Sequence, residues 1–184
     1  MKCIALIGYM CVGKTTIGKA LARHLGIGFY DLDWYIEHRF RRKITDIFAE
    51  EGEGKFRDME QRMLHEVAEF EDIVLSCGGG TPTWGDNMDF LRQTTETVYL
   101  KATPETILAH LQMARGNRPL LAGKSEAELD AYVRTQLAER EPYYAQAKHT
   151  IDISILDTHQ KISDVVACIN AQLTTEKPTL QKSQ

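Results

Sequence analysis

The sequence predicts a three-layer α/β/α protein in which a five-stranded parallel sheet lies between two layers of helices. Two observations predict this fold. Strand-like and helix-like segments alternate along the 184 residues, and a glycine-rich loop joins the first strand to the first helix. The length suits one hydrophobic core and is short for two, so we assign residues 1–173 to a single domain.

Five short apolar runs are the expected strands. Each contains β-branched residues and is bounded by polar residues or glycine, as expected of short buried strands. They occupy residues 3–7, 27–30, 73–77, 97–100 and 150–153.

The helices follow from apolar residues that recur at helical spacing. The first covers 16–25 and ends at Gly26, a residue common just after a helix. A helix over 105–113 follows Pro104, which suits the first turn of a helix. A last amphipathic helix covers 157–173.

Three regions depart from simple alternation. Residues 33–70 carry only helical patterns and therefore form a helical insertion over the sheet, which we assign to substrate binding. Residues 112–140 are polar, with several glycines and cations, and this composition favours a mobile lid over about 112–124 that closes to exclude water. Residues 174–184 lack an apolar stripe, and we expect a disordered tail.

Composition excludes several classes of function. A net charge of −4 argues against nucleic-acid binding, and the basic run at 39–43 is interpreted as a solvated helix end. The four cysteines are scattered and the six histidines show no ligand spacing, which argues against a disulfide framework or a zinc site. Neither a signal peptide nor a membrane span is recognisable. We expect a cytoplasmic monomer that binds neither membranes nor nucleic acids.

The loop after the first strand matches the phosphate-binding pattern G-x-x-x-x-G-K-[ST] at residues 8–15. Backbone N–H groups and a helix N-terminus would surround nucleotide phosphates there. Lys14 would reach the β- and γ-phosphates and Thr15 would bind Mg²⁺. The alternative is an ordinary glycine-rich turn with a surface lysine. The predicted nucleotide-binding residues are Cys11, Val12, Gly13, Lys14, Thr15 and Thr16.

Two carboxylates, Asp31 and Asp33, follow the second strand. In an extended segment residues i and i+2 point the same way, so both could face one pocket. One carboxylate could support Mg²⁺, directly or through water, and the other could accept a proton from an attacking hydroxyl. The alternative is that Asp33 merely caps a helix beginning at Trp34.

Three consecutive glycines, Gly78, Gly79 and Gly80, follow the third strand. Glycines allow the backbone to approach a ligand closely and to offer its N–H groups. The nearby Ser76 could hold a metal-bound water. Gly-rich turns after strands are common, so the position beside the phosphate loop is what favours a ligand-binding role.

Several arginines are candidates for anion binding. Arg57 and Glu60 could form an ordinary surface ion pair, or Glu60 could orient Arg57 toward an anionic substrate. Arg118 and Arg140 could likewise bind an anionic ligand, and a lid arginine often stabilises a transferring phosphoryl group. Each could also be only a surface charge.

Taken together, these motifs resemble the shikimate kinase family, from residue 2 to about 172. The matching blocks are G-Y-M-C-V-G-K-T-T-I-G at 8–18, D-L-D-W-Y-I-E at 31–37, I-F-A-E-E-G-E-G-K-F-R-D-M-E at 47–60, L-S-C-G-G-G at 75–80, R-P-L-L at 118–121 and R-E-P-Y-Y at 140–144. The resemblance implies a nucleoside-monophosphate-kinase-like fold. It also implies transfer of the ATP γ-phosphate to the 3-hydroxyl of shikimate, a step toward chorismate and the aromatic amino acids.

The resemblance also implies roles for single residues. Asp33 would contact shikimate hydroxyls and act as the base. Arg57, Gly79 and Arg140 would bind shikimate, the arginines through its carboxylate, with Gly78 and Gly80 beside them. Thr15 would bind Mg²⁺ and Asp31 would support the ion, through water. Lys14 and the lid residue Arg118 would contact ATP phosphates and offset charge on the transferring group.

The chain departs from the family pattern at two points. Cys11 stands where the family often has glycine, so we expect a backbone there that a β-carbon tolerates. Residues 153–156 offer no arginine against adenine, a feature of some members. The rival interpretations are a gluconate or nucleoside monophosphate kinase of the same fold and, in a different class, a non-catalytic nucleotide-binding module.

Overall fold

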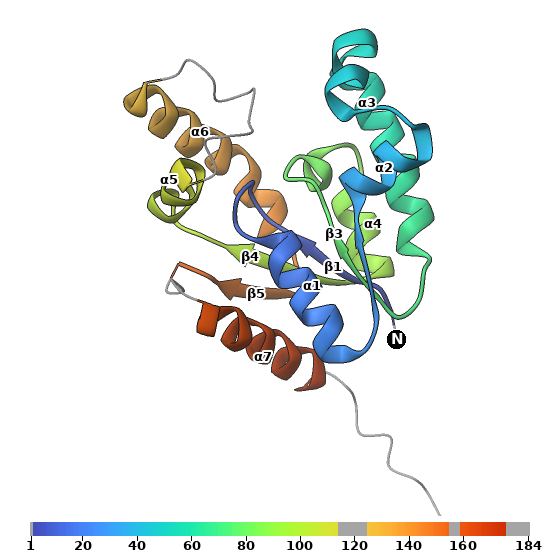
Figure 1. Ribbon diagram of the computed structural model, residues 1–184, viewed down its shortest axis with the longest axis vertical. Coiled ribbons are helices and arrows are strands. Elements are labelled where there is room, and N and C mark those ends of the chain that lie inside the picture. Colours follow the sequence, from blue (N-terminus) through green and yellow to red (C-terminus); the bar gives the residue numbers. More distant parts are fainter. Residues whose placement is uncertain (1, 114–124, 155–158, 176–184) are drawn as a thin grey trace, which may run out of the picture.

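A computed structural model describes residues 2–113, 125–154 and 159–175 of the chain, with no side-chain description at 159–161. Figure 1 shows a twisted sheet covered by helices, as the sequence predicts. The sheet is parallel, with five strands in the order β2-β3-β1-β4-β5. The strands are β1 (Ile4–Ile7), β2 (Gly28–Asp31), β3 (Ile73–Ser76), β4 (Glu96–Lys101) and β5 (His149–Asp152). The predicted strands are confirmed, and each predicted strand end lies within one residue of the observed end.

The described helices cover the sheet and extend beyond its edge. They are α1 (Lys14–Leu25), α2 (Leu32–Phe40), α3 (Ile44–Ala68), the short 3₁₀ helix η1 (Thr81–Thr83), α4 (Asn87–Thr94), α5 (Pro104–Met113), α6 (Glu126–Tyr144) and α7 (His159–Thr175). Helices α1 and α7 pack together along one face of the sheet. Beyond the sheet, α2 and α3 rise on one side and α5 and α6 on the other, with the loop after β1 between them (Figure 1).

The helical insertion predicted at 33–70 corresponds to α2 and α3. Helix α3 is the longer of the two, and it bends at Gly52, whose φ of 80° is not helical. The absence of a β-carbon permits this conformation, so the segment from residue 53 onward runs in a new direction.

Two helices are not among the sequence-based predictions. Helix α4 has only eight residues. Helix α6 occupies 126–144, mostly within the polar segment 112–140, where no helix was predicted beyond residue 113, and it starts with a capping box in which Ser125 accepts from the Glu128 N–H. Residues 174–175, which were predicted to belong to the tail, instead form the end of α7.

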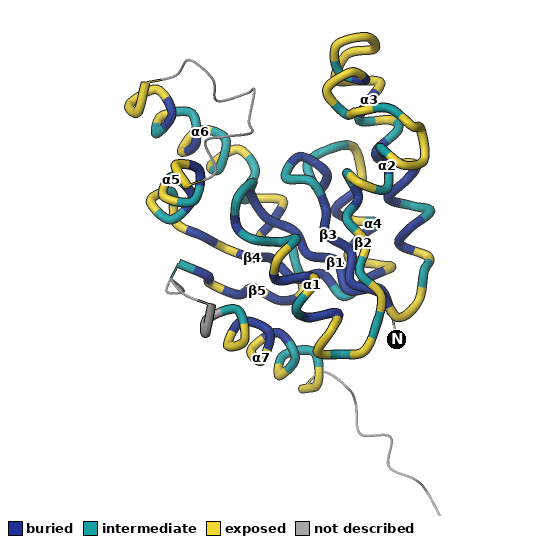
Figure 2. The backbone as a smooth tube through the Cα atoms, in the orientation of Figure 1, coloured by how far each residue is buried: buried dark blue, intermediate teal, exposed yellow. Residues whose placement is uncertain are grey.

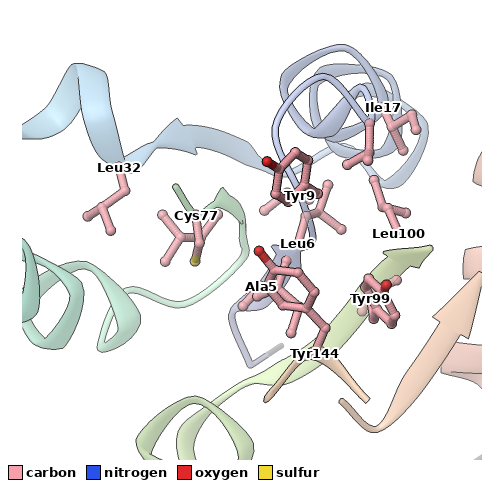
Figure 3. Close-up of a cluster of buried hydrophobic side chains, with 14 of the residues drawn as sticks. Ala5, Leu6, Tyr9, Ile17, Leu32, Cys77, Tyr99, Leu100 and Tyr144 are labelled. Atoms are coloured by element: carbon pink, nitrogen blue, oxygen red, sulfur yellow. The ribbon is translucent and has the colours of Figure 1, made fainter. Parts of the chain in front are cut away.

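The core is densest around β1 and β3, where every strand residue is buried (Figure 2). Strands covered on both faces need uninterrupted apolar sequence, which explains the Ile4–Ile7 run. The edge strand β2 instead alternates exposed and half-buried residues. Figure 3 shows large side chains, among them Tyr9, Tyr99 and Tyr144, filling the space beside β1. No described helix combines the length and apolar character needed to cross a bilayer.

Candidate active site

A pocket of about 500 Å³ lies at the carboxyl ends of β1, β2 and β3. This edge of a parallel sheet is where ligands bind in α/β folds. The lining residues come from the loop after β1 and the start of α1, from the end of β2 and the start of α2, from the end of β3 and the loop after it, and from helix α5. They are Met10, Cys11, Gly13, Lys14, Thr15, Thr16, Asp31, Asp33, Ser76, Cys77, Gly78, Gly79, His110 and Met113.

The phosphate loop curls around the ammonium group of Lys14. The Lys14 Nζ donates to the carbonyl oxygens of Gly8 at 2.8 Å and Tyr9 at 2.7 Å, and α1 begins at Lys14 itself. Burial lowers the pKa of Lys14 to about 8, although the Asp33 carboxylate opposes the shift. A dianionic phosphate in this loop would favour the charged form of the lysine and raise its pKa again. Val12 is buried in the core, so its side chain does not line the pocket and only its backbone could contact a nucleotide.

The backbone at Cys11 differs from the sequence-based expectation. Cys11 has a φ of 62°, in the left-handed region that glycine adopts most readily, so a β-carbon is strained there rather than easily accommodated. The Cys11 carbonyl lies 2.8 Å from the Nδ1 of His110 on α5. The sequence alone indicates no role for His110, because its partner is 99 residues away.

Asp31 and Asp33 both line the pocket, although not for the predicted reason. The extended segment ends at Asp31, and α2 begins at Leu32, so the alternation of an extended chain does not apply. Asp33 lies in the first helical turn instead of capping it, which shows that the helix-cap alternative is wrong. Asp31 accepts a hydrogen bond from the Thr15 hydroxyl at 2.8 Å.

The carboxyl group of Asp33 is harder to ionise than an ordinary aspartate. Burial and the neighbouring carboxylates of Glu60 and Asp31 raise its pKa to about 6, while Lys14 and Arg57 limit the rise. A group with a pKa near the working pH can both take and give up a proton.

The three glycines after β3 each face a different charged side chain. A β-carbon at Gly80 would lie 2.3 Å from Arg57 Nη2, well inside contact distance. One at Gly79 would lie 3.5 Å from Arg140 Nη1, and one at Gly78 would lie 3.0 Å from Glu60 Oε1. The run of glycines therefore leaves room for two guanidinium groups and a carboxylate around one backbone turn.

Arg57 and Glu60 form a buried pair, so the surface alternative is wrong for these residues. The Arg57 Nη1 donates to Glu60 Oε2 at 2.7 Å, and the exposed fractions of their side chains are 14% and 1%. The Thr81 hydroxyl donates to the other Glu60 oxygen at 2.6 Å. Glu60 thus holds the Arg57 guanidinium against Gly80, and Thr81 is a supporting residue that sequence analysis missed.

Arg140 approaches the same turn from α6. Its guanidinium carbon lies 5.5 Å from the centre of the Tyr9 ring, a cation–π distance, and its Nη2 donates to Gln136 at 2.7 Å. Arg57 and Arg140 therefore converge on the glycine turn from two different helices. The predicted lid and Arg118 lie outside the described residues, apart from 112–113, which end α5.

Comparisons with known proteins identify the family of the chain. Residues 10–171 match the family model for shikimate kinase. A shikimate kinase of Phocaeicola vulgatus is 45% identical over 170 residues, which cover 92% of this chain and 97% of that protein.

Solved structures resemble the whole fold. The crystal structure of shikimate kinase from Bacteroides thetaiotaomicron has a TM-score of 0.90 and 43% identity, and it covers 94% of this chain and 98% of its own. Shikimate kinase from Acinetobacter baumannii, solved in complex with shikimate, has a TM-score of 0.83 and 33% identity, covering 97% and 96%. The chain therefore belongs to the shikimate kinase family, whose members are phosphotransferases that act on an alcohol.

Proposed function

We propose that this shikimate kinase transfers the γ-phosphate of ATP to the 3-hydroxyl of shikimate, with Asp33 as the proton acceptor. The observation that carries the proposal is the convergence of Asp33, Lys14 and the glycine turn in one pocket. Phosphoryl transfer needs the donor and acceptor positioned together with charge stabilisation, and this pocket offers residues for each requirement.

The donor side consists of the phosphate loop and Lys14. The N-terminus of α1 opens at the pocket, so unpaired N–H groups of Gly13, Lys14 and Thr15 are available to phosphate oxygens. Lys14 would exchange its two carbonyl contacts for the β- and γ-phosphates of ATP. Arg118 stays a prediction as a second cation on these phosphates.

The Thr15–Asp31 pair fits a Mg²⁺ ion that arrives with the nucleotide. The hydroxyl and carboxylate are oxygen ligands of the kind Mg²⁺ prefers, and they already lie 2.8 Å apart. Within the described residues no group of three acidic, His or Cys side chains could hold a metal alone, so phosphate oxygens and water would complete the shell. When bound, Mg²⁺ offsets negative charge on the phosphates.

The acceptor side consists of Arg57, Arg140 and the glycine turn. Planar guanidinium groups match a carboxylate, and shikimate carries one carboxylate beside its hydroxyls. The complex of the Acinetobacter baumannii enzyme with shikimate supports the same acceptor here. Held by its carboxylate, the ring would present a hydroxyl to Asp33, which takes the proton as the oxygen attacks phosphorus.

The experiment is to measure ADP release from Mg·ATP with shikimate, gluconate and AMP as separate acceptors. We expect turnover with shikimate alone and its loss in D33N, which keeps the size of the side chain but cannot accept the proton. Activity with gluconate or AMP instead would favour a rival kinase of the same fold. Nucleotide binding without turnover of any acceptor would indicate a non-catalytic module.

We also infer a single-domain enzyme that works as a monomer in the cytoplasm. Family membership over residues 10–171 supports the single domain. None of the four cysteines, all of which the structure describes, forms a disulfide, which agrees with a reducing compartment.

A further inference from the structure

Helix α6 ends with a tyrosine that contacts the glycine turn directly. Tyr144 is fully buried, and its hydroxyl donates to the Gly79 carbonyl oxygen at 2.5 Å. Arg140 lies four residues earlier, which places both side chains on the same face of α6. One helix end therefore approaches Gly79 both through a hydroxyl and through a guanidinium group.

The contact has a direct consequence for the peptide bond that follows Gly79. A trans peptide unit is planar, so the Gly79 carbonyl and the Gly80 N–H point in opposite directions. Fixing the carbonyl toward α6 therefore fixes the Gly80 N–H away from α6. It also fixes the backbone over which the Arg57 guanidinium lies.

We propose that Tyr144 is a positioning residue for the acceptor substrate: its hydroxyl locks the Gly79–Gly80 peptide between Arg140 and Arg57. The inference rests on the proposed function, because it assumes that this turn and these arginines bind shikimate. Tyr144 does not itself line the pocket, so it acts through the turn and not by touching the substrate.

A second buried tyrosine shows that packing alone does not account for the contact. The Tyr99 ring lies 5.2 Å from the Tyr144 ring, but its hydroxyl donates to Glu141 and not to the glycine turn (Figure 3). Both residues fill the same part of the core, and only Tyr144 reaches Gly79. Burial also raises the pKa of Tyr144 to about 12, so its hydroxyl stays a donor throughout the physiological range.

The test compares three Tyr→Phe variants that each remove one oxygen. Y144F removes the bond to Gly79, Y99F removes a buried tyrosine hydroxyl that makes a different bond, and Y143F changes an exposed neighbour. The readouts are the KM for shikimate, the KM for ATP and the Tm of each variant.

We expect Y144F to raise the KM for shikimate by about three- to tenfold, the usual range for one net hydrogen bond. The KM for ATP should change less than about twofold, because the phosphate loop keeps its own contacts. Y99F should lower the Tm without moving the KM for shikimate, and Y143F should match the unmodified enzyme. The inference fails if Y144F moves both KM values together, or moves the KM for shikimate no more than Y99F does.

An R140A variant separates this inference from the proposed function. If R140A raises the KM for shikimate and Y144F does not, only the role of Tyr144 is wrong. If R140A leaves the KM for shikimate unchanged, the acceptor site itself is wrong, and Tyr144 loses its proposed role with it.

Discussion

At the scale of single residues, the pocket holds an acid and a base whose pKa values are displaced toward each other. Burial raises the pKa of Asp33 to about 6 and lowers the pKa of Lys14 to about 8. Between these values both groups carry their charge, which is the state that the proposed mechanism requires. Outside this window one of the two charges is lost.

The displaced pKa values predict a bell-shaped pH profile. Below about pH 6 Asp33 gains a proton and can no longer accept one, so kcat/KM for shikimate should fall about tenfold per pH unit. Above about pH 8 Lys14 loses its charge, so kcat/KM for ATP should fall. Steady-state rates from pH 4.5 to 9.5 measure both limbs. Full recovery at pH 7 after incubation at each extreme would exclude irreversible inactivation, and an unchanged far-UV circular dichroism spectrum at each pH would exclude unfolding. An acid limb near pH 4 would contradict the raised pKa of Asp33.

A single added carbon at Gly80 should disturb the acceptor side of the pocket. In G80A the new β-carbon would lie 2.3 Å from Arg57 Nη2, so the guanidinium must leave its place over the turn. We expect the KM for shikimate to rise at least about tenfold, the loss of one charged hydrogen bond. The KM for ATP should stay within about twofold.

A matched control for G80A is available in α3. A β-carbon at Gly54 would meet nothing within 4 Å, so G54A should leave both KM values unchanged and keep or raise the Tm. Equal shikimate KM values in G80A and G54A would contradict the packing of Arg57 against the turn.

At the scale of elements, helix α5 contacts the phosphate loop through the side chain of His110. The His110 ring lies 2.8 Å from the Cys11 carbonyl and donates to it when Nδ1 carries the proton. This bond supports a loop residue whose left-handed backbone costs about 1–3 kcal/mol. Helix α5 therefore helps to keep the loop in its curled form.

Removing this support should weaken nucleotide binding. We expect H110A to raise the KM for ATP by about three- to tenfold while the KM for shikimate changes little, because only the donor side loses a contact. H110N, which keeps a short N–H donor, should recover part of the loss. H38A, at an exposed position on α2, serves as the control. Equal KM values for ATP in H110A and H38A would show that the His110 contact is dispensable.

The elements found from the sequence are those with strong local signals. Strand β1 has an uninterrupted apolar run and α1 begins directly after a recognisable phosphate loop. Helix α6 was missed because its many charges hide a sparse set of buried residues, Leu129, Val133 and Tyr144. The S-x-x-E spacing of Ser125 and Glu128 was the local signal that could have found it.

In the site, too, residues that are neighbours in the sequence could be predicted, whereas contacts between residues far apart in the chain could not. Residues of the phosphate loop are neighbours in sequence, so their pattern alone predicts them. The burial of the Arg57–Glu60 pair depends on Gly80 and Thr81, which belong to the loop after another strand, so spacing alone left two alternatives open. The contact between His110 and Cys11 likewise exists only after β1 and β4 have paired.

At the scale of the whole molecule, we expect the enzyme to be a monomer of 20.9 kDa. Of the five large apolar side chains exposed on the described residues, Trp34 and Phe40 share helix α2, whereas the other three lie on separate elements, Tyr30 on β2, Met113 on α5 and Tyr143 on α6. Stable interfaces bury about 800 Å² on each partner, which needs a continuous patch. Size-exclusion chromatography with light scattering measures the mass, and a value near twice 20.9 kDa at micromolar protein would contradict the monomer.

The order of the strands in the sheet also affects when the nascent chain can fold and become active during synthesis. Strand β1 is made first but lies at the centre of the sheet, so it pairs only with strands made later. The end of α6 leaves the ribosome about 130 residues after the phosphate loop, roughly 6–26 s later at about 5–20 residues per second. Every nascent chain therefore carries a complete nucleotide-binding motif for many seconds before α6 is made. Because the proposed acceptor site needs Arg140 on α6, we expect chains that stop short of α6 to be inactive.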